Sequence, residues 1–414
     1  MDKQTLNIPY KIITWKDKAD TGAVGWIVIH NSINDVSGGG LFMHESASLQ
    51  EVKDLAYTMS LKNSLQRPIF GGGKGGIKFN PQDPRAKSVL RRFLKDNSQI
   101  IKLEWCTGGD LNTSTKDITA YLSEISDIKS PFICLANMLY RNIGINVEIE
   151  KFHRNIQASE NIFFSVEEAI TGFSIFKIIE AKVNNAKAKI IVQGFGKVGR
   201  AFCYYAQEKY EIIGICEKDW FVYDQNGINI LKLLRLDLEN NFSALQLFNP
   251  VYRKKDETNE DFLIQCLSFL RADIFCPCAV RYSITEKVLN TLISQTFTES
   301  ILKNFFIIAG ANDIFKAKNL IQIAFENNIT VIPEWLSNAG AAILFMEALK
   351  YKGNTSDWGK FVKQQVVERI YGFLNQATII AHTHGFNIYE ACSYLACTTI
   401  KKACVEQNKH FIYA

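Results

Sequence analysis

The motif Gly194-Phe-Gly-Lys-Val-Gly199 constrains the fold of this 414-residue chain more than any other feature. An apolar run at 187–193 leads directly into it, and the residues at 200–209 have the composition of a helix. A second apolar run at 212–216 follows and ends on Glu217. Strand, glycine turn, helix and strand in this order predict a βαβ unit of a Rossmann-type, doubly wound α/β sheet.

Each glycine of the motif has a separate task in such a unit. Gly194 permits the tight turn, Gly196 lets the backbone approach a pyrophosphate, and Gly199 allows the helix to pack against the strand. Glu217 can accept hydrogen bonds from a ribose diol and would repel a 2′-phosphate, so the motif predicts NAD rather than NADP. The other motif residues expected to contact the cofactor are Phe195, Lys197 and Val198.

The remaining segments extend the α/β pattern on both sides of the motif. Further strands of the doubly wound sheet are expected in 272–279, 305–312 and 329–333. For the first 130 residues, the pattern predicts strands in 21–32 and 100–105, a chain break at 37–40, helices starting at Ser48, Pro84 and Asp117, and a loop at 106–115. Residues 129–165 show no convincing period, a helix is expected from Asn338 to Tyr351, and the last sixty residues are mostly helical.

A second glycine-rich stretch, 71–76, contains a single lysine, Lys74. Glycines on both sides would let a small ligand lie against the backbone beside the ammonium, and a lysine crowded out of water is a candidate general base. The expected helix before it ends near Lys62, and the loop at 106–115 carries Asp110, so two lysines and an aspartate could bind a carboxylate and transfer a proton. Alternatively, the stretch is a flexible turn with a solvated lysine, and Asp110 caps the next helix. A phosphate-binding P-loop is excluded because Gly75 follows the lysine where Ser or Thr is needed.

Composition excludes several classes of protein. The 47 basic and 42 acidic residues are mixed along the chain, which gives no case for nucleic-acid binding. Because no apolar leader and no run of eighteen apolar residues occur, we expect a cytoplasmic protein without a membrane segment. The ten cysteines lie in apolar segments and are expected to be buried thiols, and Cys276-Pro-Cys278 is too tight for a zinc pair, so we expect no metal site.

Taken in order, the motifs resemble the glutamate, leucine, phenylalanine and valine dehydrogenase family. The matching segments are Lys62-Asn-Ser-Leu65, Gly71 to Gly76, Gly109-Asp110-Leu111, Ala169-Ile-Thr-Gly172, Gln193 to Gly199, Cys278-Ala-Val280, Gly310-Ala-Asn312 and Pro333 to Gly340. The resemblance implies a substrate-binding and oligomerisation domain at 1–160, a Rossmann domain at 161–345, and C-terminal helices at 346–414 that pack back toward the first domain. It also implies a homo-oligomer.

The activity that the resemblance implies is the reversible, NAD-dependent conversion of an L-amino acid to a 2-oxo acid and ammonia. By resemblance, Lys74 would be the catalytic base that activates water, Asp110 would carry the proton of the departing amine, and Lys62 would hold the substrate α-carboxylate. The resemblance adds Thr171, Ala279 and Asn312 to the cofactor site, and Gly39, Asn338 and Phe345 to the substrate site.

Two departures from the family pattern concern the substrate side chain. Glutamate-specific members have a lysine just before a double glycine, where this chain has Ser37-Gly-Gly-Gly-Leu41, and a serine where this chain has Phe345. Burying an unpaired carboxylate is costly, so we expect an apolar or aromatic substrate. The alternatives are a glutamate dehydrogenase that uses a repositioned cation, such as Lys78 or Lys116, and a catalytically inactive homologue that binds NAD.

Overall fold

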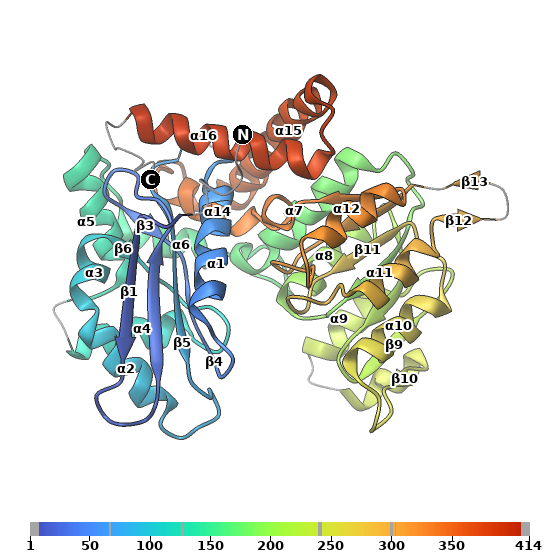
Figure 1. Cartoon of the computed structure of the whole chain (residues 1–414), viewed down its shortest axis with the longest axis horizontal. Helices are drawn as coiled ribbons and strands as arrows, with labels where there is room; N and C mark the ends of the chain where they lie inside the picture. Colours follow the sequence, from blue (N-terminus) through green and yellow to red (C-terminus); the bar gives the residue numbers. More distant parts are fainter. Residues whose placement is uncertain are drawn as a thin grey trace. The chain divides into compact units, whose positions relative to one another are not determined.

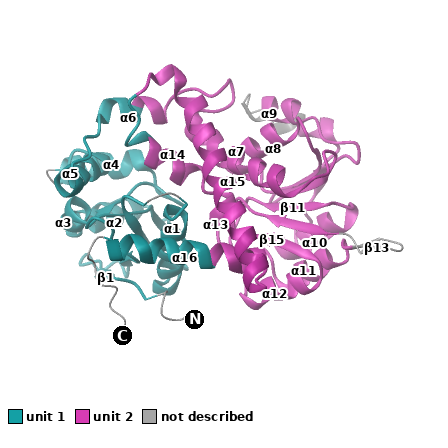
Figure 2. Cartoon of the chain, turned by 90° about the horizontal axis from the view of Figure 1, so that it is seen from above, with its two compact units in different colours: residues 1–153, 348–352, 394–414 teal, residues 154–347, 353–393 magenta. Residues whose placement is uncertain are grey.

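The computed structural model describes residues 8–65, 68–125, 128–238, 242–298, 301–302 and 304–406. The chain forms two compact units (Figure 2). Unit 1 comprises 1–153, 348–352 and 394–414, and unit 2 comprises 154–347 and 353–393. Residues 346–414 thus contribute to both units, and the N-terminal part of unit 1 ends at His153.

Unit 1 is built on a six-stranded sheet with the strand order β1-β2-β5-β3-β6, in which β4 also pairs with β5 (Figure 1). The strands are β1 (Lys11–Lys16), β2 (Val24–Ile29), β3 (Ser37–Gly38), β4 (Leu41–His44), β5 (Gly71–Lys78) and β6 (Trp105–Cys106). Strand β5 is central, because it pairs antiparallel with β2 on one side and parallel with β3 and β4 on the other. The glycine-rich stretch is thus a strand rather than a flexible turn, and the expected chain break at 37–40 includes the short strand β3.

The glycines of β5 are required by what packs on its two faces. A Cβ on Gly72 would lie 2.3 Å from the Ser60 hydroxyl oxygen on helix α1 (Leu49–Asn63), and a Cβ on Gly75 would lie 2.5 Å from the ring of Trp105. Helix α1 begins as expected, because the Ser48 hydroxyl accepts the Glu51 backbone N–H at 3.2 Å. Side chains alternate along a strand, so Lys74 shares the face of Gly72 that is covered by α1.

The other helices of the first 153 residues are α2 (Ala86–Asp96), α3 (Ser98–Leu103), α4 (Thr115–Ile125), α5 (Pro131–Ile143) and α6 (Ile149–Ile156), the last of which continues into unit 2. The expected strand at 100–105 is wrong: α3 occupies most of it and only Trp105 continues into a strand. Short apolar runs suit either structure, and here Ile101 is fully buried while Leu103 is 41% exposed. The segment without a clear period contains α5, which Ser130 caps and Gly144 ends at φ +69°.

Unit 2 contains a seven-stranded sheet in the order β10-β9-β8-β7-β11-β14-β15. Its strands are β7 (Lys189–Gln193), β8 (Glu211–Cys216), β9 (Trp220–Tyr223), β10 (Val251–Tyr252), β11 (Ile274–Pro277), β14 (Phe305–Ile308) and β15 (Ile329–Ile332), and a separate hairpin joins β12 (Phe297–Thr298) and β13 (Ile301–Leu302). Strands β8, β7, β11, β14 and β15 are parallel, and the strand order reverses at β7. Ligands of doubly wound sheets bind beside the carboxyl ends of the strands at such a point.

The helices around this sheet and beyond it are α7 (Val166–Lys182), α8 (Lys197–Ala206), α9 (Ile230–Leu238), α10 (Asn259–Phe269), α11 (Glu286–Ile293), α12 (Asn319–Glu326), α13 (Glu334–Ser337), α14 (Gly340–Ala348), α15 (Trp358–His384) and α16 (Ile388–Glu406). Helix α8 starts inside the glycine motif, three residues before the expected start, and α14 ends at Ala348 rather than at Tyr351. Within the part of the chain that the structure describes, no helix is both long and apolar enough to span a membrane.

Candidate active site

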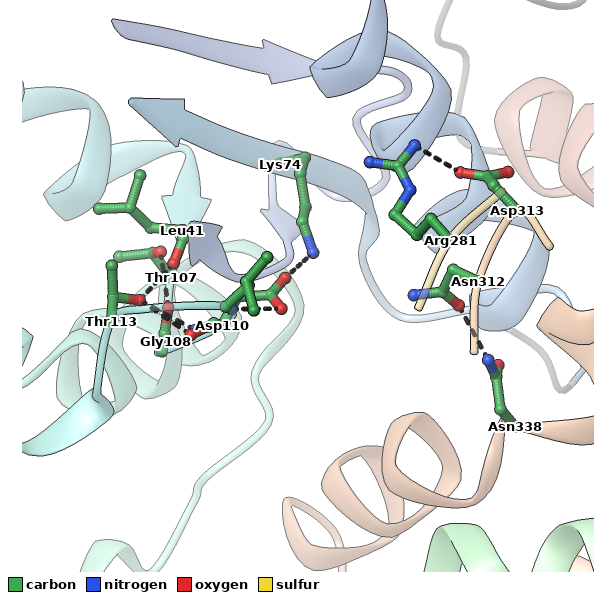
Figure 3. A network of polar contacts seen from close by, with 12 residues as sticks. Leu41, Lys74, Thr107, Gly108, Asp110, Thr113, Arg281, Asn312, Asp313 and Asn338 are labelled. Atoms are coloured by element: carbon green, nitrogen blue, oxygen red, sulfur yellow. Dashed lines mark hydrogen bonds and ion pairs between the residues drawn. The ribbon is translucent and has the colours of Figure 1, made fainter. Parts of the chain in front are cut away.

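Lys74 lies in the middle of β5 and its side chain is 6% exposed. Its ammonium donates a hydrogen bond to Asp110 Oδ2 and forms an ion pair with it (Figure 3). The lysine is therefore held on a rigid element with a carboxylate as its direct neighbour. The alternative of a solvated lysine on a flexible turn is wrong.

Asp110 lies in the loop that joins β6 to α4. Its backbone N–H donates to the Thr113 hydroxyl at 3.0 Å, and its Oδ1 accepts the Leu111 backbone N–H at 2.8 Å. The start of α4 is capped instead by the Ser114 hydroxyl, which accepts the Asp117 backbone N–H at 3.0 Å. The interpretation of Asp110 as a helix cap is therefore wrong, and its second carboxylate oxygen is directed to Lys74.

The charge on Asp110 is set by opposing effects. Removal of water by the surrounding protein raises the pKa of its carboxyl. The positive charges of Lys74 and Lys62 and the hydrogen bonds from Lys74 and the Leu111 backbone N–H lower this pKa by more, so it lies below its ordinary value. The influence of Lys62 places this lysine in the same electrostatic cluster as Lys74 and Asp110. Because 37% of the Asp110 side chain is exposed, the cluster remains accessible to water on this side.

Gly39 and its neighbour Gly40 let the segment before β4 run close to β5. A Cβ on Gly39 would lie 1.8 Å from the Gly73 carbonyl oxygen, and a Cβ on Gly40 would lie 3.1 Å from the Asp110 Cβ. Any side chain at Gly39 would therefore force β3 and β5 apart beside Lys74. Both candidate cations for a substrate carboxylate, Lys78 and Lys116, are exposed.

The dinucleotide turn in unit 2 has the geometry that each glycine was expected to provide. Gly194 has φ +92°, and a Cβ on it would lie 2.7 Å from Ala279 Cβ. A Cβ on Gly199 would lie 2.0 Å from the Gly194 carbonyl oxygen, whereas a Cβ on Gly196 would meet no atom within 4 Å. The turn is thus tight where helix and strand meet and open at Gly196, where a pyrophosphate would approach. These residues fit a dinucleotide.

Glu217 lies at the end of β8, beside the turn. Its carboxylate accepts the backbone N–H of Phe195 and, at 3.2 Å, that of Lys218. Lys197 is the first residue of α8, and its positive charge acts on Glu167 and Glu168 at the start of α7. A carboxylate and a cation therefore lie on the turn, at the positions expected for a ribose and for phosphates.

Asn312 and Asn338 form a pair at the carboxyl end of β14 (Figure 3). The Asn338 amide nitrogen donates to the Gly310 carbonyl oxygen at 3.0 Å and to Asn312 Oδ1 at 2.9 Å. Both N–H groups of Asn338 are used in this way, so this residue can offer only its oxygen to a ligand. Asn312, in contrast, has its oxygen engaged by Asn338.

Thr171 and Phe345 are the other expected site residues of unit 2. Thr171 lies on α7, and a Cβ on Gly340 would be 3.0 Å from its Cα, which puts Thr171 next to the segment that follows Asn338. Phe345 is partly buried on α14. The expected residues thus form one group in unit 1, around Lys74, and another in unit 2, where all but Phe345 are connected to the dinucleotide turn or to the ends of the neighbouring strands.

Sequence reasoning missed an ion pair next to the second group. The Arg281 guanidinium donates a hydrogen bond to Asp313 Oδ2 at 3.0 Å. Arg281 lies two residues after Ala279, and Asp313 directly follows Asn312. The sequence signal that could have revealed the pair is a positive residue shortly after β11 and a negative residue shortly after β14, which are adjacent parallel strands. Within the described residues, no cluster of His, Cys, Asp and Glu side chains is arranged to hold a metal ion.

Unit 2 is a Rossmann-type dinucleotide-binding unit, and together with the paired lysine and aspartate of unit 1 it defines a dinucleotide-dependent oxidoreductase. The comparison with protein families specifies the class. Residues 164–408 match the Glutamate/Leucine/Phenylalanine/Valine dehydrogenase model, and residues 9–127 match the dimerisation domain of the Glu/Leu/Phe/Val dehydrogenases. The chain belongs to this family of amino-acid dehydrogenases, and the predicted resemblance is confirmed.

Curated relatives include several glutamate dehydrogenases. That of Aeropyrum pernix is 25% identical over 338 residues, which are 79% of this chain and 72% of the relative. The NADP-specific glutamate dehydrogenase of Saccharolobus shibatae is 27% identical, over 85% of this chain and 77% of the relative. The catabolic NAD-specific glutamate dehydrogenase RocG of Bacillus subtilis is 25% identical, over 81% and 72%.

Solved structures share the fold. The hetero-hexameric glutamate dehydrogenase of Thermus thermophilus superposes with a TM-score of 0.69 at 16% identity, over 99% of this chain and 92% of that one. The L-tryptophan dehydrogenase of Nostoc punctiforme gives a TM-score of 0.59 at 17% identity, over 97% and 98%. The expected α/β architecture with a Rossmann domain is confirmed, whereas the expected apolar or aromatic substrate gains no support from the curated relatives.

Proposed function

We propose that the protein catalyses the reversible oxidative deamination of an L-amino acid to a 2-oxo acid and ammonia, with glutamate as the first candidate substrate. The observation that carries the proposal is the ion pair between the buried Lys74 and the partly exposed Asp110, with Lys62 in the same cluster, in a chain whose second unit holds a dinucleotide turn. Glutamate takes precedence over an apolar substrate because the curated relatives described above are glutamate dehydrogenases.

Each residue of the unit 1 cluster has a role that fits its surroundings. Lys62, at the end of α1, holds the substrate α-carboxylate by charge. Lys74 is fixed on a central strand and orients and deprotonates the attacking water. Asp110 is partly exposed, so it exchanges the proton of the departing amine with solvent.

The cofactor in this proposal is NAD, held by the Gly194–Gly199 turn and by Glu217. When bound, NAD supplies the acceptor for the hydride that leaves the substrate Cα. The negative charge of Glu217 next to the turn disfavours a 2′-phosphate, although one curated relative is NADP-specific. Asn312 and Thr171 orient the nicotinamide, and Asn338 offers an oxygen to the substrate amine. We further propose a cytoplasmic homo-oligomer, since the matching N-terminal model describes a dimerisation domain.

An apolar or aromatic amino acid is the second candidate substrate. It is favoured by the two departures, because no lysine stands before the double glycine in Ser37-Gly-Gly-Gly40 and the partly buried Phe345 replaces a serine, so neither place offers a partner for a side-chain carboxylate. A glutamate dehydrogenase would need another cation at this place, for which Lys78 and Lys116 are the candidates.

The deciding experiment is a panel of L-amino acids assayed with NAD and with NADP at alkaline pH, following the reduced cofactor by absorbance. Saturable turnover of glutamate that is lost in Lys78→Met or Lys116→Met supports the first candidate, and preference for leucine or phenylalanine supports the second. A folded preparation that binds NADH but turns over no amino acid would contradict the proposal and leave an inactive NAD-binding homologue.

A further inference from the structure

Two loops of unit 2 lie against the dinucleotide turn, namely the 279–282 loop after β11 and the 311–313 loop after β14. Ala279 begins the first loop, and its Cβ would be 2.7 Å from a Cβ added to Gly194. Gly310 precedes the second loop, and a Cβ added to it would be 2.7 Å from Val198 Cγ1 in the glycine motif. Since β7, β11 and β14 are adjacent and parallel, both loops stand at the strand ends that bind the cofactor.

The two loops are tied to each other by backbone and side-chain bonds. The Tyr282 backbone N–H donates to the Asp313 carbonyl oxygen at 2.9 Å, and the Ile284 backbone N–H donates to the Ile314 carbonyl oxygen at 2.8 Å. Above these bonds the Arg281 guanidinium donates to Asp313 Oδ2 at 3.0 Å and to the Tyr282 hydroxyl at 2.9 Å. The guanidinium carbon also lies 4.9 Å from the centre of the Tyr282 ring.

The clamp formed by these bonds joins two non-glycine residues whose backbone is left-handed, a conformation that is costly for the bulky Tyr282 and less so for Asp313. Tyr282 has φ +56° and Asp313 has φ +46°. Such residues persist only where surrounding contacts hold them. The side chains of the pair are only 20% and 23% exposed, so the ion pair is partly shielded from water and helps to hold both residues.

The contacts of Asp313 adjoin those of Asn312, its neighbour in the chain. The Asp313 backbone N–H donates to Glu334 Oε1 at 3.2 Å, and the Asn312 side chain accepts the Asn338 amide at 2.9 Å (Figure 3). Asn312 is thus held through its side chain by Asn338 and through its chain neighbour by Arg281 and Glu334. Loss of Arg281 leaves Asp313 in its left-handed conformation with one restraint fewer.

We infer that the Arg281–Asp313 pair is a positioning device that holds the 279–282 and 311–313 loops, and with them Asn312, in the arrangement that receives the nicotinamide half of the cofactor. The inference rests on the proposed function. Arg281 acts through Asp313 and Asn312 and is a positioning residue rather than a catalytic one. Its removal weakens binding of the nicotinamide half and spares the part of the site formed by the glycine turn.

The test compares two ligands in binding measurements that do not depend on turnover. NADH and ADP-ribose share the pyrophosphate and the adenosine half, but only NADH carries nicotinamide. In Arg281→Met we expect the Kd of NADH to rise about tenfold and that of ADP-ribose by less than about twofold. Arg281→Lys keeps the charge and should give an intermediate Kd for NADH. In steady-state assays the KM for NAD should rise while the KM for the amino acid is unchanged.

Lys177→Met is the matched control, because Lys177 forms an ion pair with Glu180 in the same unit and these side chains are exposed to a similar degree, 21% and 25%. This variant should bind both ligands like the unmodified protein. Equal loss of NADH and ADP-ribose in Arg281→Met, or no loss of either, would overturn the inference while leaving the proposed function intact. Failure of the unmodified protein to bind either ligand would instead overturn the proposed function, and the inference with it.

Discussion

Substituting Gly75 by alanine tests whether the glycines of β5 exist for packing. The added Cβ would lie 2.5 Å from Trp105 Cη2 and 2.8 Å from Leu41 Cδ1, and both of these side chains are fully buried. Overpacking of this kind costs about 1–3 kcal/mol. Alanine also restricts the unfolded chain, which offsets about 0.4–1 kcal/mol, so a net destabilisation of unit 1 by about 1–2 kcal/mol is expected.

Unfolding in urea, monitored by hydrogen exchange in peptides that cover 71–78, reports on this unit specifically. With a slope of about 2 kcal/mol per molar urea, the midpoint should fall by about 0.5–1 M. Activity should fall at least about tenfold, since Lys74 is the adjacent residue and small displacements of a catalytic group are costly. Gly372→Ala is the control: its Cβ would meet no atom within 4 Å, and alanine in helix α15 should stabilise by about 0.5–1 kcal/mol.

The compensating variant makes the reasoning refutable. Trp105→Phe removes the ring atoms that the new methyl group would strike, so the double variant Gly75→Ala/Trp105→Phe should be more stable than the sum of the single changes predicts, by about 1 kcal/mol. If Gly75→Ala is neutral, or if the two changes are strictly additive, the glycines of β5 are not set by packing against Trp105.

Three further predictions concern charge and cofactor. Lys74→Met should lower kcat by about 10²–10⁴-fold and leave the Kd of NADH unchanged by fluorescence titration; a kcat within twofold of the original would contradict a role in proton transfer. The hydrogen bond from Arg92 lowers the pKa of Asp17 from 3.8 to about 2, so the stability that the pair contributes is present above about pH 4 and is lost as the pH falls toward 2. Arg92→Met should therefore cost about 1–2 kcal/mol in urea unfolding at pH 7 and clearly less at pH 3, and an equal cost at both pH values would show that packing dominates. Glu217→Ser should lower the ratio of kcat/KM for NAD to that for NADP about tenfold, and an unchanged ratio would mean that other groups exclude the 2′-phosphate.

The dinucleotide unit could be predicted because its signals are local. Apolar runs, turn glycines and the acidic residue Glu217 follow one another within about thirty residues of chain, the usual length of such a unit. The structure changes only the bounds of its elements: α8 begins at Lys197 within the motif and ends at Ala206, and β7 begins at Lys189. Such a strand, glycine turn and helix can be predicted from sequence because the conformation of each residue depends mainly on its neighbours in the chain.

Strand β5 could not be predicted because the residues that require its glycines are distant in the chain. Glycine has a low intrinsic preference for strands, so the sequence left a flexible turn open as an alternative and predicted no strand there. Its place in the sheet depends on Trp105, thirty residues later, and on Ser60 of α1. The Arg281–Asp313 pair was missed for the same reason, since its partners meet only when β11 and β14 become neighbours.

The division of labour between Lys74 and Asp110 follows from the elements that carry them. Lys74 belongs to a strand that is hydrogen-bonded on both sides and covered by α1, and only 6% of its side chain reaches solvent, so it cannot readily exchange protons with bulk water by itself. Asp110 belongs to a loop and is 37% exposed, and its carboxylate is the direct partner of the ammonium. A proton that enters or leaves Lys74 therefore passes most directly through Asp110. In Asp110→Asn the proposed reaction should fail at proton transfer, while the lysine stays in place on its strand.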